Sequence, residues 1–282
     1  MTTTWYGDEP PPEPLRIGLG GGLRILLKGG LLAIVVFGGL GLLLIVRILE
    51  RPVCGLRRPV TPHITVAVCR LALLIIGLKL HQHGNVARDA SAIVANHASW
   101  LDIFVLNARK RIYFVSKSDV AHWPGIGWLA RATGTLFIER KRARAVDQAH
   151  LFKGRLRAGH RLLFFPEGTS SDGQRVLPFK SSLFAAFFTD ELRDQMQIQP
   201  VTLCYCAPKD VDPRFYCWWG DMDFGPHFLT ILAAPRQGYV ALTYHTPLRV
   251  VEFSDRKSLA TAAEHAVRRS QPNLDVRTDA LS

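Results

Sequence analysis

The sequence lacks a regular cysteine framework. Its 282 residues include five cysteines, of which Cys204 and Cys206 lie close together with Cys217 following. No C-x-x-C knuckle and no paired second half accompanies this group, which argues against a disulfide scaffold and against a structural zinc site. We therefore expect buried, reduced thiols and no bound metal.

Two other motifs are also missing. The chain contains no G-x-S-x-G, which argues against a serine hydrolase of the α/β type. No compact basic segment opens the sequence and no small-residue cleavage site follows its first apolar run, so we do not expect a secretory signal. An internal repeat is absent as well, which excludes solenoid and propeller architectures.

What the chain does have is positive charge and apolar sequence. Lysine and arginine number 35 against 23 acidic residues, and hydrophobic residues make up 48% of the chain. The net charge of +12 indicates a polyanionic partner, either nucleic acid or an anionic lipid surface. The basic residues are spread over loops without interleaved aromatics, so we expect a membrane surface and no nucleic acid.

The N-terminal part of the sequence separates into a tail and two apolar stretches. Residues 1–22 begin proline-rich and acidic, which predicts a disordered tail. Residues 29–46 carry no charge and five glycines, and a helix of about 27 Å would barely cross a hydrocarbon core of about 30 Å. Arg70 interrupts the second stretch, residues 63–80. We expect a membrane-associated helical hairpin over residues 23–82 that either crosses the bilayer or dips into one leaflet.

Short apolar runs alternate with helical patterns in the rest of the chain. Strands are predicted for residues 91–96, 111–117, 134–140, 161–167, 198–205 and 239–248. Helices are predicted for residues 99–110, 124–132, 143–159 and 180–194. This alternation predicts an α/β domain over residues 83–255, a largely parallel mixed sheet flanked by helices. Residues 256–282 are expected to form a C-terminal helix and tail.

The stretch "NHASWLD", residues 96–102, lies where a predicted strand meets a predicted helix. Ligand and catalytic residues gather at such junctions in open α/β sheets. Ser99 and Asp102 also fit a capping pattern, so Asp102 alone could be a helix cap. His97 beside an apolar strand fits a structural role as well as a catalytic one.

Two more segments place basic groups at strand ends. In "GTLFIER", residues 134–140, a strand would aim Arg140 out of the sheet's edge, although a solvated surface arginine fits the same pattern. Lys117 follows the strand "YFVS" and is a further candidate for holding a phosphate.

A third segment, "FFPEGTSSDG" at residues 164–173, follows an apolar strand with a turn. Gly168 permits a tight turn that exposes backbone N–H groups and the hydroxyls of Thr169 and Ser170 to an anion. A plain surface turn is the alternative. It accounts poorly for Glu167, because a carboxylate directly after two phenylalanines and a proline is expected to hold the loop or a nearby arginine.

Taken together, these motifs resemble the glycerolipid acyltransferase family, the lysophosphatidic acid acyltransferases. That family has H-x4-D, as in "HASWLD", G-x5-R, as in "GTLFIER", and F-P-E-G-T-S, as in "FPEGTS". Its fourth block, an apolar strand ending in a proline-containing turn, is similar to "IQPVTLCY" around Pro200. The resemblance covers about residues 90–250, with the blocks in the same order.

The resemblance implies roles for the candidate site residues. His97 would be the general base, and Asp102 would fix its tautomer. Acceptor binding would fall to the remaining candidates, namely Arg140, Glu167, Gly168, Thr169, Ser170 and Lys117. The acyl donor would be a thioester, either acyl-coenzyme A or acyl carrier protein, and no cofactor would be required.

The expected function is transfer of a fatty acyl group to the free hydroxyl of a lysophospholipid, 1-acyl-sn-glycerol-3-phosphate, giving phosphatidic acid. A lyso-ornithine lipid is an alternative acceptor within the same family, and a non-catalytic basic membrane-binding protein is a more distant alternative. The expected location is the bacterial inner membrane, with the catalytic domain on its cytoplasmic side.

Overall fold

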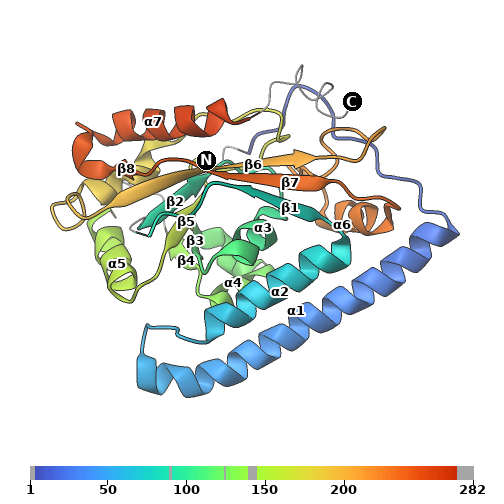
Figure 1. Ribbon diagram of the computed structural model, residues 1–282, viewed down its shortest axis with the longest axis horizontal. Helices are drawn as coiled ribbons and strands as arrows, with labels where there is room; N and C mark the ends of the chain where they lie inside the picture. Colours follow the sequence, from blue (N-terminus) through green and yellow to red (C-terminus); the bar gives the residue numbers. More distant parts are fainter. Residues whose placement is uncertain (1–3, 89–90, 124, 139–144, 272–282) are drawn as a thin grey trace.

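The computed structural model describes residues 4–88, 91–123, 125–138 and 145–271. Strands and helices alternate along the chain and build one sheet with helices on both faces (Figure 1). A long apolar helix precedes the sheet at the N-terminal end. The predicted fold class, an α/β domain with a largely parallel mixed sheet, is confirmed.

The sheet has eight strands in the described residues. They are β1 (Lys79–His83), β2 (Ala92–Ala95), β3 (Tyr113–Lys117), β4 (Leu136–Ile138), β5 (Leu162–Phe164), β6 (Gln197–Cys206), β7 (Tyr239–Tyr244) and β8 (Leu248–Arg249). The order is β1-β7-β6-β2-β5-β3-β4, with β8 paired to β6. Only β6–β7 and β6–β8 are antiparallel among these pairs. The parallel strands β2, β5, β3 and β4 therefore end at one edge of the sheet.

Helices cover both faces of this sheet. The α-helices are α1 (Leu19–Cys54), α2 (Thr61–Ile76), α3 (Asp102–Arg109), α4 (Ile126–Thr133), α5 (Ala145–Arg157), α6 (Phe224–Ala233) and α7 (Arg256–Arg269). Three 3₁₀ helices are η1 (Ser118–His122), η3 (Ser181–Phe188) and η4 (Val250–Glu252). Figure 1 shows α7 on one side of the sheet and α2, with α1 beneath it, on the other.

Strand β2 illustrates why the sheet is buried on both faces. Ile93 and Ala95 pack into an apolar cluster with α2, α3 and α6. Ala92 and Val94 face the opposite way, into a second cluster with α5, η3 and α7. All four side chains are buried, as is typical of a parallel strand covered on both sides. The core therefore lies in two layers, with the central strands between them.

The helix α1 lies alongside the α/β domain. Its 36 residues give a length of about 54 Å, well above the hydrocarbon thickness of about 30 Å. It packs beside α2, and Arg24 Nε donates to the carbonyl of Ala233 at the end of α6 over 2.7 Å. Only 11% of its most apolar stretch is buried. One face of α1 therefore contacts protein, and the other presents apolar side chains outward.

The structure differs from the sequence-based expectations in several elements. Residues 79–83, assigned mostly to the hairpin, form the edge strand β1, whose side chains alternate between exposed and half-buried. The predicted helix over residues 180–194 is the 3₁₀ helix η3 followed by turns. Pro200 lies inside β6 and not in a turn, and its carbonyl accepts a hydrogen bond from the His245 N–H over 3.0 Å. Helix α6 was not predicted.

The N-terminal tail also differs from the prediction. Residues 4–18 have no helix or strand, yet they lie against the α/β domain. Trp5 packs against Trp219 with 6.4 Å between ring centroids, and Asp8 pairs with Arg175 over 2.9 Å. The proline-rich, acidic composition predicted disorder, but the tryptophan finds an apolar partner and the acid finds a basic surface.

Candidate active site

The sheet topology brings the predicted motifs to one edge. His97 follows β2, and Glu167 follows β5, the neighbouring parallel strand. Lys117 ends β3, the next strand along. Carboxyl ends of parallel strands are the usual position of ligand and catalytic groups in open α/β sheets. Arg140 would follow β4 at the same edge, but it lies outside the described residues.

Asp102 lies at the start of α3 and is fully buried. Its Oδ2 atom accepts a hydrogen bond from His97 Nδ1 over 2.7 Å. The same oxygen accepts from the backbone N–H groups of Ala98 at 2.9 Å and Ser99 at 3.2 Å, and Oδ1 accepts from the Tyr205 hydroxyl at 2.6 Å. These four donors compensate for the water that the carboxylate loses on burial.

One nitrogen of the His97 ring is hydrogen-bonded to Asp102, and the other has no hydrogen-bond partner among the described residues. Because the ionised Asp102 carboxylate can only accept, Nδ1 carries the proton and Nε2 is left as an acceptor. The ring stacks on Phe165 with centroids 4.1 Å apart and is 23% exposed. Within the part of the chain that the structure describes, Nε2 forms no hydrogen bond. The arrangement therefore presents one imidazole lone pair to the outside.

Glu167 is buried behind the histidine loop. Its Oε1 atom accepts from the His97 backbone N–H over 2.9 Å, and Oε2 accepts from the Leu177 N–H over 3.1 Å. Burial raises the Glu167 pKa to about 8, and the nearby Asp102 charge acts in the same direction against the two N–H donors. The side chain is only 1% exposed, so it positions the loop and is not placed to touch an acceptor.

Backbone hydrogen bonds fix the same loop from two other segments. The Ser171 N–H donates to the His97 carbonyl over 2.9 Å. The Trp218 N–H donates to the Ala98 carbonyl over 2.8 Å. The histidine is therefore held by the segment after β5 and by a segment near residue 218, which is far away in the sequence.

The predicted anion-binding turn is only partly open. Gly168 adopts a left-handed conformation with φ of 78°, as expected for a tight turn, and its N–H donates to the Phe165 carbonyl over 3.1 Å. The Thr169 hydroxyl accepts from the Trp5 N–H over 3.4 Å, and Ser170 is buried. The N-terminal segment therefore lies on this turn.

Lys117 stands at the same sheet edge but apart from the histidine loop. It ends β3 and forms an ion pair with Asp119 in η1. A phosphate role for Lys117 would require this pair to open or to be shared. The roles of Lys117 and Arg140 in acceptor binding stay predictions.

Several residues that build the site were not predicted from the sequence. Tyr205 lies in the fourth block, on the strand that borders β2, and its spacing along β6 could have placed it near the histidine loop. Its pKa is well above the ordinary value because of burial and the Asp102 charge, so it stays a donor. Phe165 was noted only as part of an apolar run. Nothing in the sequence indicated that Trp218 would reach this loop.

An apolar wall of aromatic rings lies next to the loop. Trp100 contacts Phe104, Phe224 and Phe228 with ring centroids between 5.3 and 6.0 Å apart. Its Nε1–H donates to His227 Nδ1 over 3.0 Å. Burial lowers the His227 pKa to about 4, so the neutral ring accepts at Nδ1 and donates from Nε2 to a carbonyl. This wall can accept a hydrocarbon chain on chemical grounds.

Comparisons with known proteins agree with this picture. A family model described as acyltransferase matches residues 77–203. A lyso-ornithine lipid O-acyltransferase of Rhodobacter capsulatus is 54% identical over 94% of this chain and 95% of that protein. A 1-acyl-sn-glycerol-3-phosphate acyltransferase of Neisseria gonorrhoeae is 36% identical over 40% of this chain and 45% of that protein.

A solved structure has the same fold. The crystal structure of the 1-acyl-sn-glycerophosphate (LPA) acyltransferase PlsC from Thermotoga maritima superimposes with a TM-score of 0.60 and 23% identity. The match covers 91% of this chain and 98% of that one. With a near full-length relative at 54% identity and the four motifs in place, the chain belongs to the acyltransferase family and is an acyl-transferring enzyme.

Proposed function

We propose that this enzyme transfers a fatty acyl group from an acyl thioester to the free hydroxyl of lyso-ornithine lipid, with His97 as general base. The observation that carries the catalytic assignment is the 2.7 Å hydrogen bond from His97 Nδ1 to the buried Asp102. It leaves a partly exposed Nε2 facing outward. Support for the acceptor comes from the R. capsulatus relative, which is similar over almost the whole chain.

The chemistry of the step requires a base and no covalent enzyme intermediate. An aliphatic hydroxyl is a weak nucleophile at neutral pH, so His97 Nε2 accepts its proton as the oxygen attacks the thioester carbon. Asp102 stabilises the imidazolium that forms. Collapse of the tetrahedral intermediate breaks the C–S bond, and the leaving thiolate takes the proton from the imidazolium. The products are the diacyl lipid and the free thiol.

The donor is a thioester of coenzyme A or of acyl carrier protein, and no other cofactor enters this reaction. Trp100, the centre of the aromatic wall, follows His97 by three residues, and the wall is suited to the acyl chain. Hydrophobic enclosure of the chain would also keep water away from the thioester carbon.

1-Acyl-sn-glycerol-3-phosphate is the second candidate acceptor, and it is the acceptor that the motifs alone favoured. The Neisseria relative supports it, but over a smaller part of the chain. The two acceptors differ in the anion that must be held. One carries a phosphate, and the other carries the carboxylate of an amino acid without a phosphate, which Arg140 would then face.

Membrane association follows from the apolar outer face of α1. We propose that α1 and α2 lie in one leaflet and do not cross the bilayer. Arg24 Nε near one end of α1 donates to the Ala233 carbonyl over 2.7 Å, and Arg58, in the loop after its other end, donates to the Ala132 carbonyl over 2.8 Å. Both ends of α1 thus stay close to the same α/β domain. The proposed location is the cytoplasmic side of the bacterial inner membrane, where acyl thioesters are made.

The test compares the two acceptors with the purified full-length protein in detergent micelles. Initial rates are measured with matched chain lengths of lyso-ornithine lipid and lysophosphatidic acid, each with acyl carrier protein and coenzyme A thioesters. We expect kcat/KM to be at least about tenfold higher for lyso-ornithine lipid, since a mismatched anion leaves a buried polar group unpaired. A higher value for lysophosphatidic acid would reverse the acceptor assignment.

His97→Ala tests the base independently of the acceptor. We expect kcat to fall by about 10²–10⁴-fold with both acceptors, which is the usual contribution of a positioned base. The variant should keep its thermal unfolding midpoint, because the ring is partly exposed. Substantial turnover by a correctly folded variant would remove His97 from the mechanism.

A further inference from the structure

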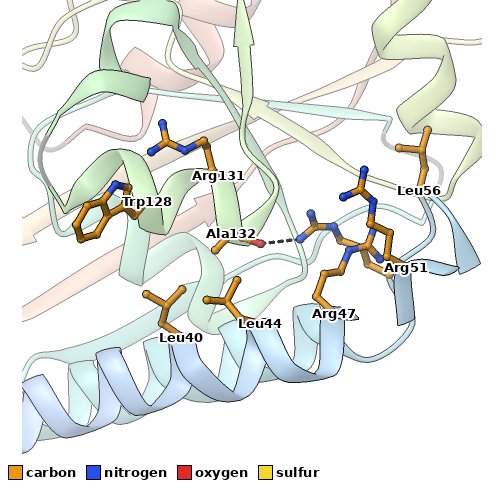
Figure 2. A pocket seen from close by; sticks show the side chains of 9 residues that line it. Leu40, Leu44, Arg47, Arg51, Leu56, Trp128, Arg131 and Ala132 are labelled. Carbon is orange, nitrogen blue, oxygen red and sulfur yellow. Dashed lines mark hydrogen bonds between the residues drawn. The ribbon is translucent and has the colours of Figure 1, made fainter. Parts of the chain in front are cut away.

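A pocket of about 600 Å³ lies between α1 and α4, apart from the histidine loop. Among the residues that the structure describes, four arginines line it, namely Arg47, Arg51, Arg58 and Arg131, and no acidic residue does. Figure 2 shows Leu40, Leu44 and Arg47 rising from α1 toward α4, which contributes Trp128 and Arg131 on the opposite side.

The α1 side of the pocket changes from apolar to basic along the helix. Leu40, Leu44, Arg47 and Arg51 are spaced by four, three and four residues, so they share one face of α1. This stripe spans about 16 Å along the helix axis. An apolar stretch that ends in arginines is typical of a segment that passes from hydrocarbon to the headgroup level of a bilayer.

The α4 side fits the same depth. Trp128 lines the pocket and is 67% exposed. This exposed fraction is high for tryptophan, which is buried for the most part in folded proteins. Tryptophan is enriched at membrane–water interfaces, where its ring lies at the headgroup level. The pocket thus has a wet, basic part next to a part that suits the upper acyl chains.

The arginines of this pocket carry more charge than the protein neutralises. Glu50 pairs with Arg47 over 3.1 Å, but it is already the acceptor for the first turn of α2, including the Thr61 hydroxyl at 2.8 Å. Arg58 donates to the Ala132 carbonyl over 2.8 Å, a neutral partner. The Arg51 side chain forms no hydrogen bond or ion pair with any described residue.

Neighbouring groups respond to this excess charge. His160 is buried beside the pocket's inner wall, and burial followed by the positive charges of Arg155, Arg58 and Arg47 lowers its pKa to about 4. Burial and the charge of Arg58 likewise lower the Arg155 pKa to about 10. An anion in the pocket would relieve this repulsion.

The pocket is not part of the catalytic edge. Arg58 contacts Ala132, which precedes β4, whereas His97 follows β2. The strands β2 and β4 belong to the parallel part of the sheet and run in the same direction. Ala132 therefore lies at the amino ends of these strands, and His97 lies at their carboxyl ends. The Arg58 guanidinium packs directly against Gly134, since a Cβ at that glycine would lie 2.9 Å from the Arg58 Cζ.

We propose that this pocket binds the phosphate of an anionic membrane phospholipid as a resident, non-substrate lipid. The guanidinium fork matches phosphate oxygens in two-point contacts, and four such groups around one cavity suit a charged headgroup. Leu40, Leu44 and Trp128 suit the attached chains. An acidic carrier protein would also be attracted by charge, but a concave pocket on a membrane-embedded helix favours a lipid. The proposal does not depend on the identity of the acceptor.

The test measures lipid binding with His97→Ala protein and without an acyl donor, so that no acyl transfer occurs during the measurement. Native mass spectrometry of the full chain in micelles counts bound phosphatidylglycerol and phosphatidylcholine of the same acyl chains. The paired change Arg51→Gln with Arg131→Gln removes two exposed pocket arginines. Arg57→Gln is the control for removal of a positive charge, because Arg57 is an exposed arginine in the loop after α1 that does not line the pocket.

We expect one retained phosphatidylglycerol in the parent and in Arg57→Gln. The paired variant should bind it at least about tenfold more weakly, given two lost charge-assisted contacts, and phosphatidylcholine should bind weakly to all three proteins. Arg51→Gln alone should have an intermediate effect. Thermal unfolding of each variant confirms that the fold is kept.

Four outcomes would overturn the proposal. Equal retention of phosphatidylglycerol by the parent and the paired variant would show that the pocket does not hold it. Equal binding of phosphatidylglycerol and phosphatidylcholine would show that the pocket does not select a lipid by its headgroup charge. Displacement of phosphatidylglycerol by millimolar inorganic phosphate, or loss of acyl carrier protein binding with unchanged lipid retention, would assign the pocket to another anion.

Discussion

The Asp102 carboxylate accepts hydrogen bonds from four donors, three in its own loop and one on β6. The backbone N–H groups of Ala98 and Ser99 are those that a helix cap would satisfy. The ring of His97 is the partner that a catalytic pair requires. One side chain therefore makes the hydrogen bonds of a cap and of the proposed catalytic pair, and the cap fixes the carboxylate in the position from which it orients the imidazole.

Tyr205→Phe tests how far the β6 donor contributes to catalysis. The change removes an O–H that lies 2.6 Å from Asp102 Oδ1 and leaves that oxygen buried without a partner. We expect kcat to fall about tenfold, from a loss of about 1–2 kcal/mol, with KM for the acceptor unchanged. Tyr244→Phe is the control, because Tyr244 is a buried tyrosine of the same sheet outside the site. Equal effects of the two changes on kcat would make Tyr205 a packing residue only.

Glu167→Gln tests the loop anchor. Both carboxylate oxygens accept backbone N–H groups, from His97 and from Leu177, whereas an amide would turn its NH₂ toward one of these donors. We expect a loss of about 1–3 kcal/mol of stability and a lower kcat, with a smaller effect on acceptor KM. A raised KM with unchanged kcat would instead indicate direct contact with the acceptor.

At the scale of elements, the hairpin of α1 and α2 depends on one close approach. A Cβ at Gly39 would collide with Cγ2 of Val68 on α2, whereas a Cβ at Gly41 meets nothing within 4 Å. We expect Gly39→Ala to destabilise the protein by about 1–2 kcal/mol, because overpacking exceeds the gain in helix propensity. Gly41→Ala should be neutral or stabilising by up to about 1 kcal/mol. Thermal unfolding in detergent compares them, and similar midpoints would show that the helices separate freely.

The elements that sequence predicted correctly are those whose pattern does not depend on distant partners. The runs around β2, β3 and β5 are short, apolar and followed by polar turns, because both of their faces are covered. Strand β1 was missed because "KLHQH" is a polar edge strand directly after an apolar helix. Helix α6 was missed because its ten residues form a short apolar run without clear period.

In the candidate site, too, the residues that were predicted are those whose motif does not depend on distant partners. His97, Asp102 and Glu167 were predicted from the family motifs that they resemble, and these motifs lie at strand ends that converge once the strands are parallel. Tyr205 and Trp218 were not, because their contacts depend on the position of β6 beside β2 and on the path of a long connection. The hydrogen bond from the Trp5 N–H to the Thr169 hydroxyl could not be predicted. It joins residues 164 positions apart, and Trp5 lies in a segment without regular secondary structure.

At the scale of the whole molecule, the candidate active site and the apolar helix α1 lie on different parts of the protein. The parallel strands bring the candidate catalytic residues to one edge of the sheet, and α1 runs along the domain (Figure 1). Only 11% of the most apolar stretch of α1 is buried. Stability of the soluble part sets the range of pH in which this arrangement persists.

His160 predicts a specific loss of stability in acid. Its ring is buried and stacks on Tyr113 with centroids 4.0 Å apart, and its pKa of about 4 lies below the unfolded value of about 6.5. The unfolded chain therefore binds more protons between these values, so the stabilising contribution is complete above pH 6.5 and is lost as pH falls toward 4. For this residue the loss is about 2 kcal/mol between pH 7 and pH 5. His227 acts in the same direction, and Glu167, whose pKa is raised, acts in the opposite one.

Because several groups titrate together, the contribution of His160 is isolated by substitution. His160→Phe keeps an aromatic ring against Tyr113 but cannot take up a proton. We expect the drop in unfolding midpoint from pH 7 to pH 5 to be smaller in this variant by several degrees, at about 2–4 °C per kcal/mol. His265→Asn, at an exposed position of α7, should leave the drop unchanged. If the two variants and the parent lose the same number of degrees, the buried ring is not the group that couples acid to unfolding, and protonation elsewhere must open the domain.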